Sequence, residues 1–242
     1  MPKRKPKALK RISTGLPLLD KLLGGGLVLG STTLLHSDLG AGKTTLLLQT
    51  VMHDGSALYA SGEMRTDALH LYCERLSVSV APDTLIGVDE GGGDVKKMCA
   101  FAEKLKVQKV VVDSLPTAWL DDVRGDAGSP QMIKVVANYL TEWALQKKIC
   151  VVVVGHRNRD GAPPESVLQL VDAVLEMGRY NDNEDPLGIA YDRNGELREG
   201  MRNLRVIGCI KSRYCESDVE ELFVLDADKG FAPYVSKLAK LP

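Results

Sequence analysis

A short glycine-rich stretch, residues 37–44, constrains the fold more than any other part of the sequence. It reads Ser-Asp-Leu-Gly-Ala-Gly-Lys-Thr and lies between an apolar run at 32–36 and apolar residues with helical spacing at 46–52. A strand, a glycine-rich turn and a helix in this order form a phosphate-binding loop, because the glycines let consecutive N–H groups converge on an anion at the positive end of the helix. The sequence therefore predicts a site for a nucleotide triphosphate.

Two side chains at the end of this stretch have predicted roles. Lys43 is expected to reach the β- and γ-phosphates, and the Thr44 hydroxyl to coordinate Mg²⁺. The stretch departs once from G-x-x-x-x-G-K-[ST], because Ser37 replaces the first glycine; a small residue still fits there, and Gly40 can supply the bend. The alternative is a glycine-rich turn with a solvated lysine, and the order of strand, loop and apolar helix favours the nucleotide site.

Two carboxylates follow apolar runs that we interpret as strands. Glu63 follows the run 57–61, and Asp113 ends the valine-rich run 109–113. In a parallel sheet, ligands bind at the carboxyl ends of the strands. We therefore predict that Glu63 activates the water that attacks the γ-phosphate and that Asp113 organises Mg²⁺. The alternative for Glu63 is a cap for the helix that starts near Thr66.

A third apolar run, 149–154, ends in Gly155-His156 and places His156 at the same predicted edge. There it could sense the γ-phosphate through a hydrogen bond that is lost on hydrolysis; the alternative is an exposed loop histidine. The predicted nucleotide-binding residues are Ser37, Asp38, Leu39, Gly40, Ala41, Gly42, Lys43, Thr44, Thr45 and His156.

Composition bounds the remaining possibilities. The chain has 242 residues, 44% of them hydrophobic, which suits one well-buried core over residues 12–242. Residues 1–11 are basic and contain no acid, so we expect a flexible arm that either contacts phosphate or only aids solubility. The five cysteines are scattered without a C-x-x-C pair, which indicates reduced thiols and no zinc site. Apolar runs are far shorter than the about 18 residues of a membrane span, so a cytoplasmic protein is expected.

Nucleic acid would have to meet a local patch, because the formal net charge is −1. Arg157 and Arg159 lie in a polar loop that follows His156, and Arg124 lies in the polar loop 120–129. Such loops suit contacts with a phosphate backbone, although solvated loops have the same composition. Towards the carboxyl terminus, the runs 202–211 and 219–225 predict an antiparallel hairpin.

In its order of motifs, the chain resembles the RecA-like ATPases, and most closely the core of the RadA (Sms) family of bacterial DNA-repair proteins. The resemblance rests on Ser13-Thr14-Gly15, Leu23-Gly24-Gly25-Gly26-Leu27, the phosphate loop, Tyr59-Ala60-Ser61-Gly62-Glu63, Asp113-Ser114, Val154-Gly155-His156, Val171-Asp172-Ala173-Val174-Leu175 and Lys211-Ser212-Arg213-Tyr214. It implies an α/β fold of the RecA-like P-loop type, with a mostly parallel central sheet, helices on both faces and a C-terminal antiparallel hairpin.

The resemblance also implies roles that the local sequence does not show. Lys211 and Arg213 match the family's Lys-Asn-Arg-Phe-Gly signature, which acts on the nucleotide of the neighbouring subunit. The signature is altered, since Ser212, Tyr214 and Cys215 stand where the family prefers Asn, Phe and Gly. The family's zinc module and protease-like domain are not expected, because no paired cysteines precede Ile12 and the chain ends soon after the hairpin.

The phosphate loop and the carboxylates predict an ATPase that uses ATP and Mg²⁺. The resemblance implies that it is stimulated by single-stranded DNA and assembles into a homo-oligomer. The family resemblance implies a hexameric ring. Such a motor would act as a translocase or helicase in DNA recombination, repair or replication. The alternatives are a KaiC-like signalling ATPase that regulates a protein partner, and a nucleotide-gated scaffold without hydrolysis, for which Ser37 is the hint.

Overall fold

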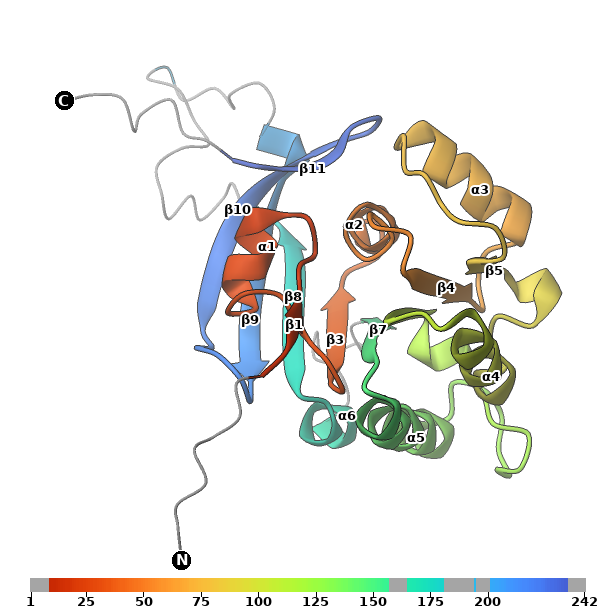
Figure 1. Cartoon of the computed structure of the whole chain (residues 1–242). Coiled ribbons are helices and arrows are strands. Elements are labelled where there is room, and N and C mark those ends of the chain that lie inside the picture. Colours follow the sequence, from red (N-terminus) through yellow and green to blue (C-terminus); the bar gives the residue numbers. More distant parts are fainter. Residues whose placement is uncertain (1–8, 157–164, 181–193, 195–200, 235–242) are drawn as a thin grey trace, which may run out of the picture.

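The computed structural model describes residues 9–156, 165–180, 194 and 201–234 (Figure 1). Its centre is a sheet in the order β11-β10-β9-β8-β3-β7-β6-β4-β5. The strands, in chain order, are β3 Thr32–Ser37, β4 Ala57–Ser61, β5 Leu85–Ile86, β6 Lys109–Asp113, β7 Cys150–His156, β8 Ala173–Arg179, β9 Leu204–Ser212, β10 Val219–Asp226 and β11 Gly230–Pro233. The strands from β8 to β5 pair in parallel, whereas β8–β9, β9–β10 and β10–β11 pair antiparallel. The expected fold class is confirmed.

Helices cover both faces of the sheet (Figure 1). The α-helices are α1 Pro17–Leu22, α2 Lys43–Thr50, α3 Thr66–Arg75, α4 Val95–Leu105, α5 Pro130–Lys147 and α6 Glu165–Leu170, and short 3₁₀ helices are η1 Val88–Glu90, η2 Leu115–Thr117 and η3 Met201–Asn203. α1, α2 and α3 contribute to one apolar cluster, while α4, α5 and α6 contribute to the other.

The central strands explain this division into two cores. Along β7, Val151 and Val153 pack into the cluster under α5, and Val152 and Val154 pack into the cluster under α2. Successive side chains of a strand point to opposite faces, so a strand covered on both sides must be apolar throughout. Each fully buried valine contributes about 1.5–3 kcal/mol relative to an exposed one. The valine runs are therefore the main reason that these segments form central strands.

The register brings the ends of the parallel strands to one edge of the sheet. Ser37 at the end of β3 pairs with His156 at the end of β7, and Ser61 at the end of β4 pairs with Asp113 at the end of β6. Segments that are far apart in the sequence therefore meet where the phosphate loop begins.

Helix ends agree with the sequence signals in part. Ser129 caps α5 by accepting a hydrogen bond from the Met132 N–H at 3.3 Å, and Pro130 occupies the first turn, a position that favours proline. Thr14 precedes α1 but does not cap it. The helix begins after Leu16, which makes no side-chain cap, and the Thr14 hydroxyl instead donates to Asp20 Oδ1 at 2.7 Å.

Three short strands have no counterpart among the predicted elements. β1 (Arg11–Ile12) and β2 (Leu27–Val28) form a separate two-stranded sheet, and β11 adds a strand after the predicted hairpin. Strands of two to four residues are too short to show a period in the sequence. β8 begins at Ala173 and is mostly buried, because it lies between β3 and β9.

The five cysteines form no disulfide in the structure, and most of them are buried. Cys73, Cys99, Cys150 and Cys209 are buried, Cys215 is half-buried, and all five are free thiols. Burial raises the pKa of Cys99 and of Cys150 to about 12, so these thiols stay protonated and unreactive.

Within the described ranges, no group of three or more potential ligands could hold a metal such as zinc, and none of the helices there is both long and apolar enough to span a membrane.

Candidate active site

The turn from β3 into α2 has the geometry of a phosphate-binding loop. Gly40 and Gly42 have φ values of 71° and 108°, a region that favours glycine. A Cβ on Gly42 would also lie 2.9 Å from Leu225 Cδ2 and 3.1 Å from Phe231 Cζ, so glycine is required for space as well. Gly42 precedes α2 and provides no side-chain cap, which leaves the first N–H groups of the helix available to an anion.

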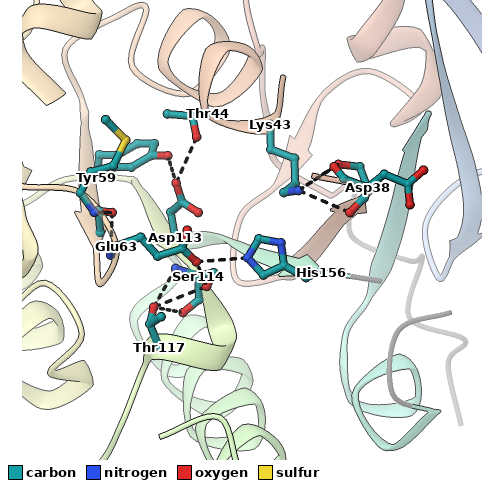
Figure 2. Close-up of polar contacts among 12 residues, drawn as sticks. Asp38, Lys43, Thr44, Tyr59, Glu63, Asp113, Ser114, Thr117 and His156 are labelled. Atoms are coloured by element: carbon teal, nitrogen blue, oxygen red, sulfur yellow. Dashed lines mark hydrogen bonds and ion pairs between the residues drawn. The ribbon is translucent and has the colours of Figure 1, made fainter. Parts of the chain in front are cut away.

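Lys43 is buried inside this loop, with 8% of its surface exposed. Its ammonium donates to Ser37 Oγ at 2.9 Å and to the Asp38 carbonyl oxygen at 3.3 Å (Figure 2). Burial lowers the pKa of Lys43, although the carboxylates of Asp113, Glu63 and Asp38 oppose that shift. The Ser37 hydroxyl thus gives the lysine a partner that glycine in the usual pattern would lack.

Asp113 and Thr44, the two residues predicted to hold Mg²⁺, contact each other. Asp113 Oδ2 accepts hydrogen bonds from Thr44 Oγ1 at 3.4 Å and from the Tyr59 hydroxyl at 2.5 Å. Burial raises the pKa of Asp113, whereas the Tyr59 and Thr44 hydrogen bonds lower it. Mg²⁺ in nucleotide sites prefers one or two protein oxygens together with phosphate oxygens, so this hydroxyl and carboxylate fit that ion.

Tyr59 is a site residue that the sequence pattern does not reveal. It lies within β4 and is fully buried, and its hydroxyl points at Asp113 (Figure 2). Burial and the nearby Asp113 charge raise the pKa of Tyr59 well above its ordinary value, so the hydroxyl remains a donor. In the sequence it is one apolar-strand residue among several, and no spacing distinguishes it.

Glu63 lies opposite Lys43 in the same cavity and contacts two donors. Glu63 Oε1 accepts hydrogen bonds from the Ser114 hydroxyl and from His156 Nε2, the latter at 3.1 Å (Figure 2). The His156 hydrogen bond is the main cause of the lowered pKa of Glu63, and the Ser114 bond adds to it. Glu63 does not cap α3, whose first turn follows Arg65 without a side-chain cap. Glu63 and His156 therefore lie at the same edge of the sheet, and their roles stay predictions.

Ser114 contacts Glu63 directly, and Thr117 holds Ser114 in place. The Ser114 N–H donates to Thr117 Oγ1 at 3.1 Å, and Thr117 Oγ1 donates to the Ser114 carbonyl oxygen at 2.9 Å. A Cβ on Gly62 would lie 2.4 Å from Thr117 Oγ1, which explains the glycine before Glu63. Neither Ser114 nor Thr117 stands out in the sequence, because the glutamate that they support is far from them along the chain.

A cavity of about 320 Å³ joins these groups. Besides the loop, Glu63, Asp113 and His156, it is lined by Thr45, Tyr72, Arg75 and residues 225–227, where β10 ends and the following turn begins. The Tyr72 and Thr45 hydroxyls lie 3.3 Å apart, and the Arg75 guanidinium lies 4.2 Å from the centre of the Tyr72 ring. Tyr72 and Arg75 are not among the predicted site residues, since Tyr72 fits the apolar face of an amphipathic helix.

Other predicted residues lie elsewhere. Lys211 Nζ donates to the Val171 carbonyl oxygen at 2.8 Å, and Arg213 Nη1 donates to Asp172 Oδ1 at 2.9 Å. Lys211 pairs with Val174 near the start of β8, at the opposite edge of the sheet from the phosphate loop. Neither cation therefore contacts the cavity of its own chain, and their action on a neighbouring subunit stays a prediction.

The predicted DNA contacts are only partly described. Arg124 is exposed in the loop between η2 and α5, as expected for a loop residue. Arg157 and Arg159 lie outside the described residues. Their roles stay predictions.

Several known proteins are similar to this chain in sequence. Residues 11–184 match the family model described as "Family of unknown function (DUF7125)". The "DNA repair protein RadA" of Haemophilus influenzae is 35% identical over 195 residues, which are 78% of this chain and 42% of that protein. Those of Mycobacterium tuberculosis H37Rv and Rickettsia bellii are 32% and 34% identical, over 88% and 91% of this chain. They are covered to 41% and 50% of their own lengths, so this chain spans half or less of these relatives.

A solved structure extends the likeness in fold. The crystal structure of a KaiC-like protein from Pyrococcus horikoshii matches with a TM-score of 0.70 at 17% identity, and the match covers 94% of this chain and 100% of that one. At this identity the match shows a shared fold only. The chain thus has a RecA-like fold similar to the core of the RadA proteins, and it belongs to the DUF7125 family.

Proposed function

We propose that this chain is a Mg²⁺-dependent ATPase of the RecA type that acts on DNA. The observation that supports the proposal most is the single cavity that joins the phosphate loop, Lys43, Thr44, Asp113 and Glu63. These are an anion cradle, a cation, two oxygen donors for a metal and a candidate base. Phosphoryl transfer needs this combination, because its catalysis depends mainly on positioning and charge stabilisation.

In the proposed mechanism, the α2 N–H groups and Lys43 bind the phosphates. Thr44 and Asp113 would hold Mg²⁺, which when bound neutralises charge on the β- and γ-phosphate oxygens. Glu63 orients a water and accepts its proton as the water oxygen bonds to the γ-phosphorus and the bond to the ADP oxygen breaks. For this step Glu63 has to exchange the hydrogen bonds from His156 and Ser114 for one from water. His156 can then report whether a γ-phosphate is present.

The side of the cavity formed by Tyr72 and Arg75 suits the base of the nucleotide. A guanidinium stacked on an aromatic ring offers a flat cationic surface against which a base can lie. Residues 225–227 also line this cavity. We assign the base to the side of Tyr72 and Arg75 because the phosphate loop and the carboxylates occupy the other.

Oligomerisation is part of the proposal. Lys211 and Arg213 lie away from the cavity of their own chain, which is compatible with contact to the nucleotide of a neighbour in a homo-oligomeric ring, with six subunits as the family resemblance implies. Arg124, Arg157 and Arg159 would then face single-stranded DNA in the central channel and move with nucleotide state. The RadA relatives, named as DNA-repair proteins, support a role in repair or recombination, with translocase or helicase action as the finer proposal.

ATP hydrolysis measured with and without single-stranded DNA tests this function. We expect DNA to stimulate hydrolysis by the parent protein, and we expect Arg157→Ala/Arg159→Ala to abolish that stimulation while basal hydrolysis persists. The double variant should also weaken the salt dependence of DNA binding, by about 0.7 in the log–log slope for each phosphate that is no longer neutralised. Hydrolysis that is indifferent to DNA would favour a KaiC-like signalling ATPase, and absent hydrolysis would favour a scaffold.

The Tyr59 hydroxyl provides a test of the magnesium site. Tyr59→Phe should raise the Mg²⁺ concentration needed for half-maximal hydrolysis roughly 10-fold, because a hydrogen bond to a charged group contributes about 1.5–3 kcal/mol. That bond lowers the pKa of Asp113, so its removal raises this pKa further, and the acid-side fall in Mg²⁺ affinity should move to higher pH. Tyr214→Phe is a matched control, since the Tyr214 hydroxyl lies 3.0 Å from Asp172 at the opposite edge. Equal Mg²⁺ requirements in all three proteins would contradict the assignment.

A further inference from the structure

A groove lined by lysines lies at the edge of the sheet opposite the nucleotide cavity. It has a volume of about 610 Å³, and its lysines are Lys10, Lys106, Lys147 and Lys148. Gln108 and Ile149, which also line it, directly precede β6 and β7, whereas the nucleotide cavity lies at the ends of those strands. We call these four side chains and the surface between them the lysine groove. None of the four lysines lines the nucleotide cavity.

The charge of the lysine groove is largely uncompensated. Glu103 is the one carboxylate among the described residues that line it, and Glu103 is neutralised by Lys147, whose Nζ lies 2.6 Å from Oε2. The Trp143 indole N–H also donates to Glu103, at 2.9 Å. In the described part of the chain, no carboxylate lies within ion-pair distance of Lys10, Lys106 or Lys148. A chain with a net charge of −1 thus concentrates cations here.

Two of these lysines occupy backbone positions that favour glycine. Lys106 ends α4 and Lys148 ends α5, with φ values of 56° and 57°. The two helices end in the same way: the N–H group of Val107 donates to the Ala102 carbonyl oxygen, and the N–H group of Ile149 donates to the Ala144 carbonyl oxygen. A side chain is disfavoured at such positions, because its Cβ crowds the backbone. Two helix ends nevertheless present a lysine to the same groove.

The lysine content of the groove favours a polyanion over a protein as its ligand. Protein interfaces are depleted in lysine, whereas lysine contacts with phosphate dominate nucleic-acid binding. Contacts of this kind position a strand without reading its sequence, which suits a groove of flexible ammonium groups. The sequence before Lys10 adds Lys3, Arg4, Lys5 and Lys7 without an acid, so the cationic character continues along the chain. A basic surface of this kind would repel the basic arm of a second copy.

We propose that the lysine groove binds the phosphate backbone of a nucleic acid, as a contact separate from the loops that contain Arg124, Arg157 and Arg159. A nucleic-acid strand bound there would lie at the edge of the sheet opposite the nucleotide cavity. The contact is independent of base sequence and of ATP hydrolysis.

The helix-end geometry provides a test that does not endanger folding. Lys106→Gly/Lys148→Gly removes two charges and replaces both residues by the one that their φ values favour, so the melting temperature should stay equal or rise. Affinity for a fluorescein-labelled oligothymidylate, measured without nucleotide at about 0.1 M salt, should fall roughly 25-fold, and the log–log salt slope should fall by about 1.4. A duplex probe should show a similar decrease. Hydrolysis of ATP without DNA should be unchanged.

Two control variants distinguish binding in the lysine groove from a general effect of positive charge. Lys97→Gln/Lys134→Gln removes the same charge from the opening turns of the same helices and should keep parental affinity. Lys106→Arg/Lys148→Arg keeps the charge and should bind like the parent.

Parental affinity in the glycine variant, or an equal decrease in the glutamine variant, would overturn the proposal. So would polyglutamate binding that needs Lys106 and Lys148 as strongly as the oligonucleotide does, since an acidic partner would then fit the groove equally well. The readout is binding without nucleotide, so absence of DNA-stimulated hydrolysis alone would overturn the proposed motor and leave the lysine groove standing.

Discussion

A Lys43→Ala variant is expected to bind ATP weakly and to hydrolyse it slowly, with kcat/KM reduced by roughly 100- to 1,000-fold or more. Among the described residues that line the cavity, Lys43 is the cation that reaches into the phosphate loop, while Arg75 and His156 lie further along it. Lys43 is buried, and a charge interaction with phosphate is screened far less there than at the surface. Alanine also removes the donor to Ser37 Oγ and to the Asp38 carbonyl oxygen, so the loop loses internal support.

Calorimetric titration with ATP and Mg²⁺, together with a phosphate-release assay, measures both effects. Lys134→Ala, an exposed lysine in α5, is the control for removal of a positive charge and should behave like the parent. A thermal melt by circular dichroism checks that Lys43→Ala still folds. Parental ATP affinity and turnover in a folded Lys43→Ala protein would remove the basis for the nucleotide site.

The parts of the site that the sequence predicts well are those set by chain order. Asp113, His156 and the phosphate loop each follow an apolar strand, and parallel strands deliver their ends to one edge. No knowledge of side-chain contacts is needed for that step. The continuous apolar composition of the valine-rich runs separately indicates strands that are covered on both faces.

The parts that the sequence does not predict depend on side chains that meet across the sheet. Tyr59 reaches Asp113 over a separation of 54 residues, and Ser114 reaches Glu63 over 51. A tyrosine in a strand or a serine after one has no periodicity that identifies its partner. The structure alone also shows that Arg213 holds Asp172, whose other oxygen accepts from the Thr32 N–H at 2.9 Å. Through these two bonds, Asp172 connects the loop that contains Arg213 to the start of β3.

A Glu63→Gln variant is expected to bind ATP but to hydrolyse it roughly 100- to 10,000-fold more slowly, which is the range of general base catalysis. Glutamine has the shape of glutamate, and its Oε1 can still accept hydrogen bonds from His156 and Ser114. The local arrangement therefore persists while the group that takes the proton of water is removed. Because the carboxylate next to Lys43 is neutralised, the dissociation constant for ATP should stay equal or fall.

The pH profile distinguishes a base from a residue that only holds the structure. The pKa of Glu63 is lowered, so in the parent it is ionised across the neutral range, and at saturating Mg²⁺ hydrolysis should fall as the pH drops through that low pKa. In Glu63→Gln this acid limb should disappear from the residual rate. Glu90→Gln, which changes an exposed glutamate outside the cavity, is the matched control and should keep the parental rate and profile. A Glu63→Gln protein with parental turnover would place the base elsewhere and leave the hydrogen bonds of Glu63 to His156 and Ser114 with a purely structural role.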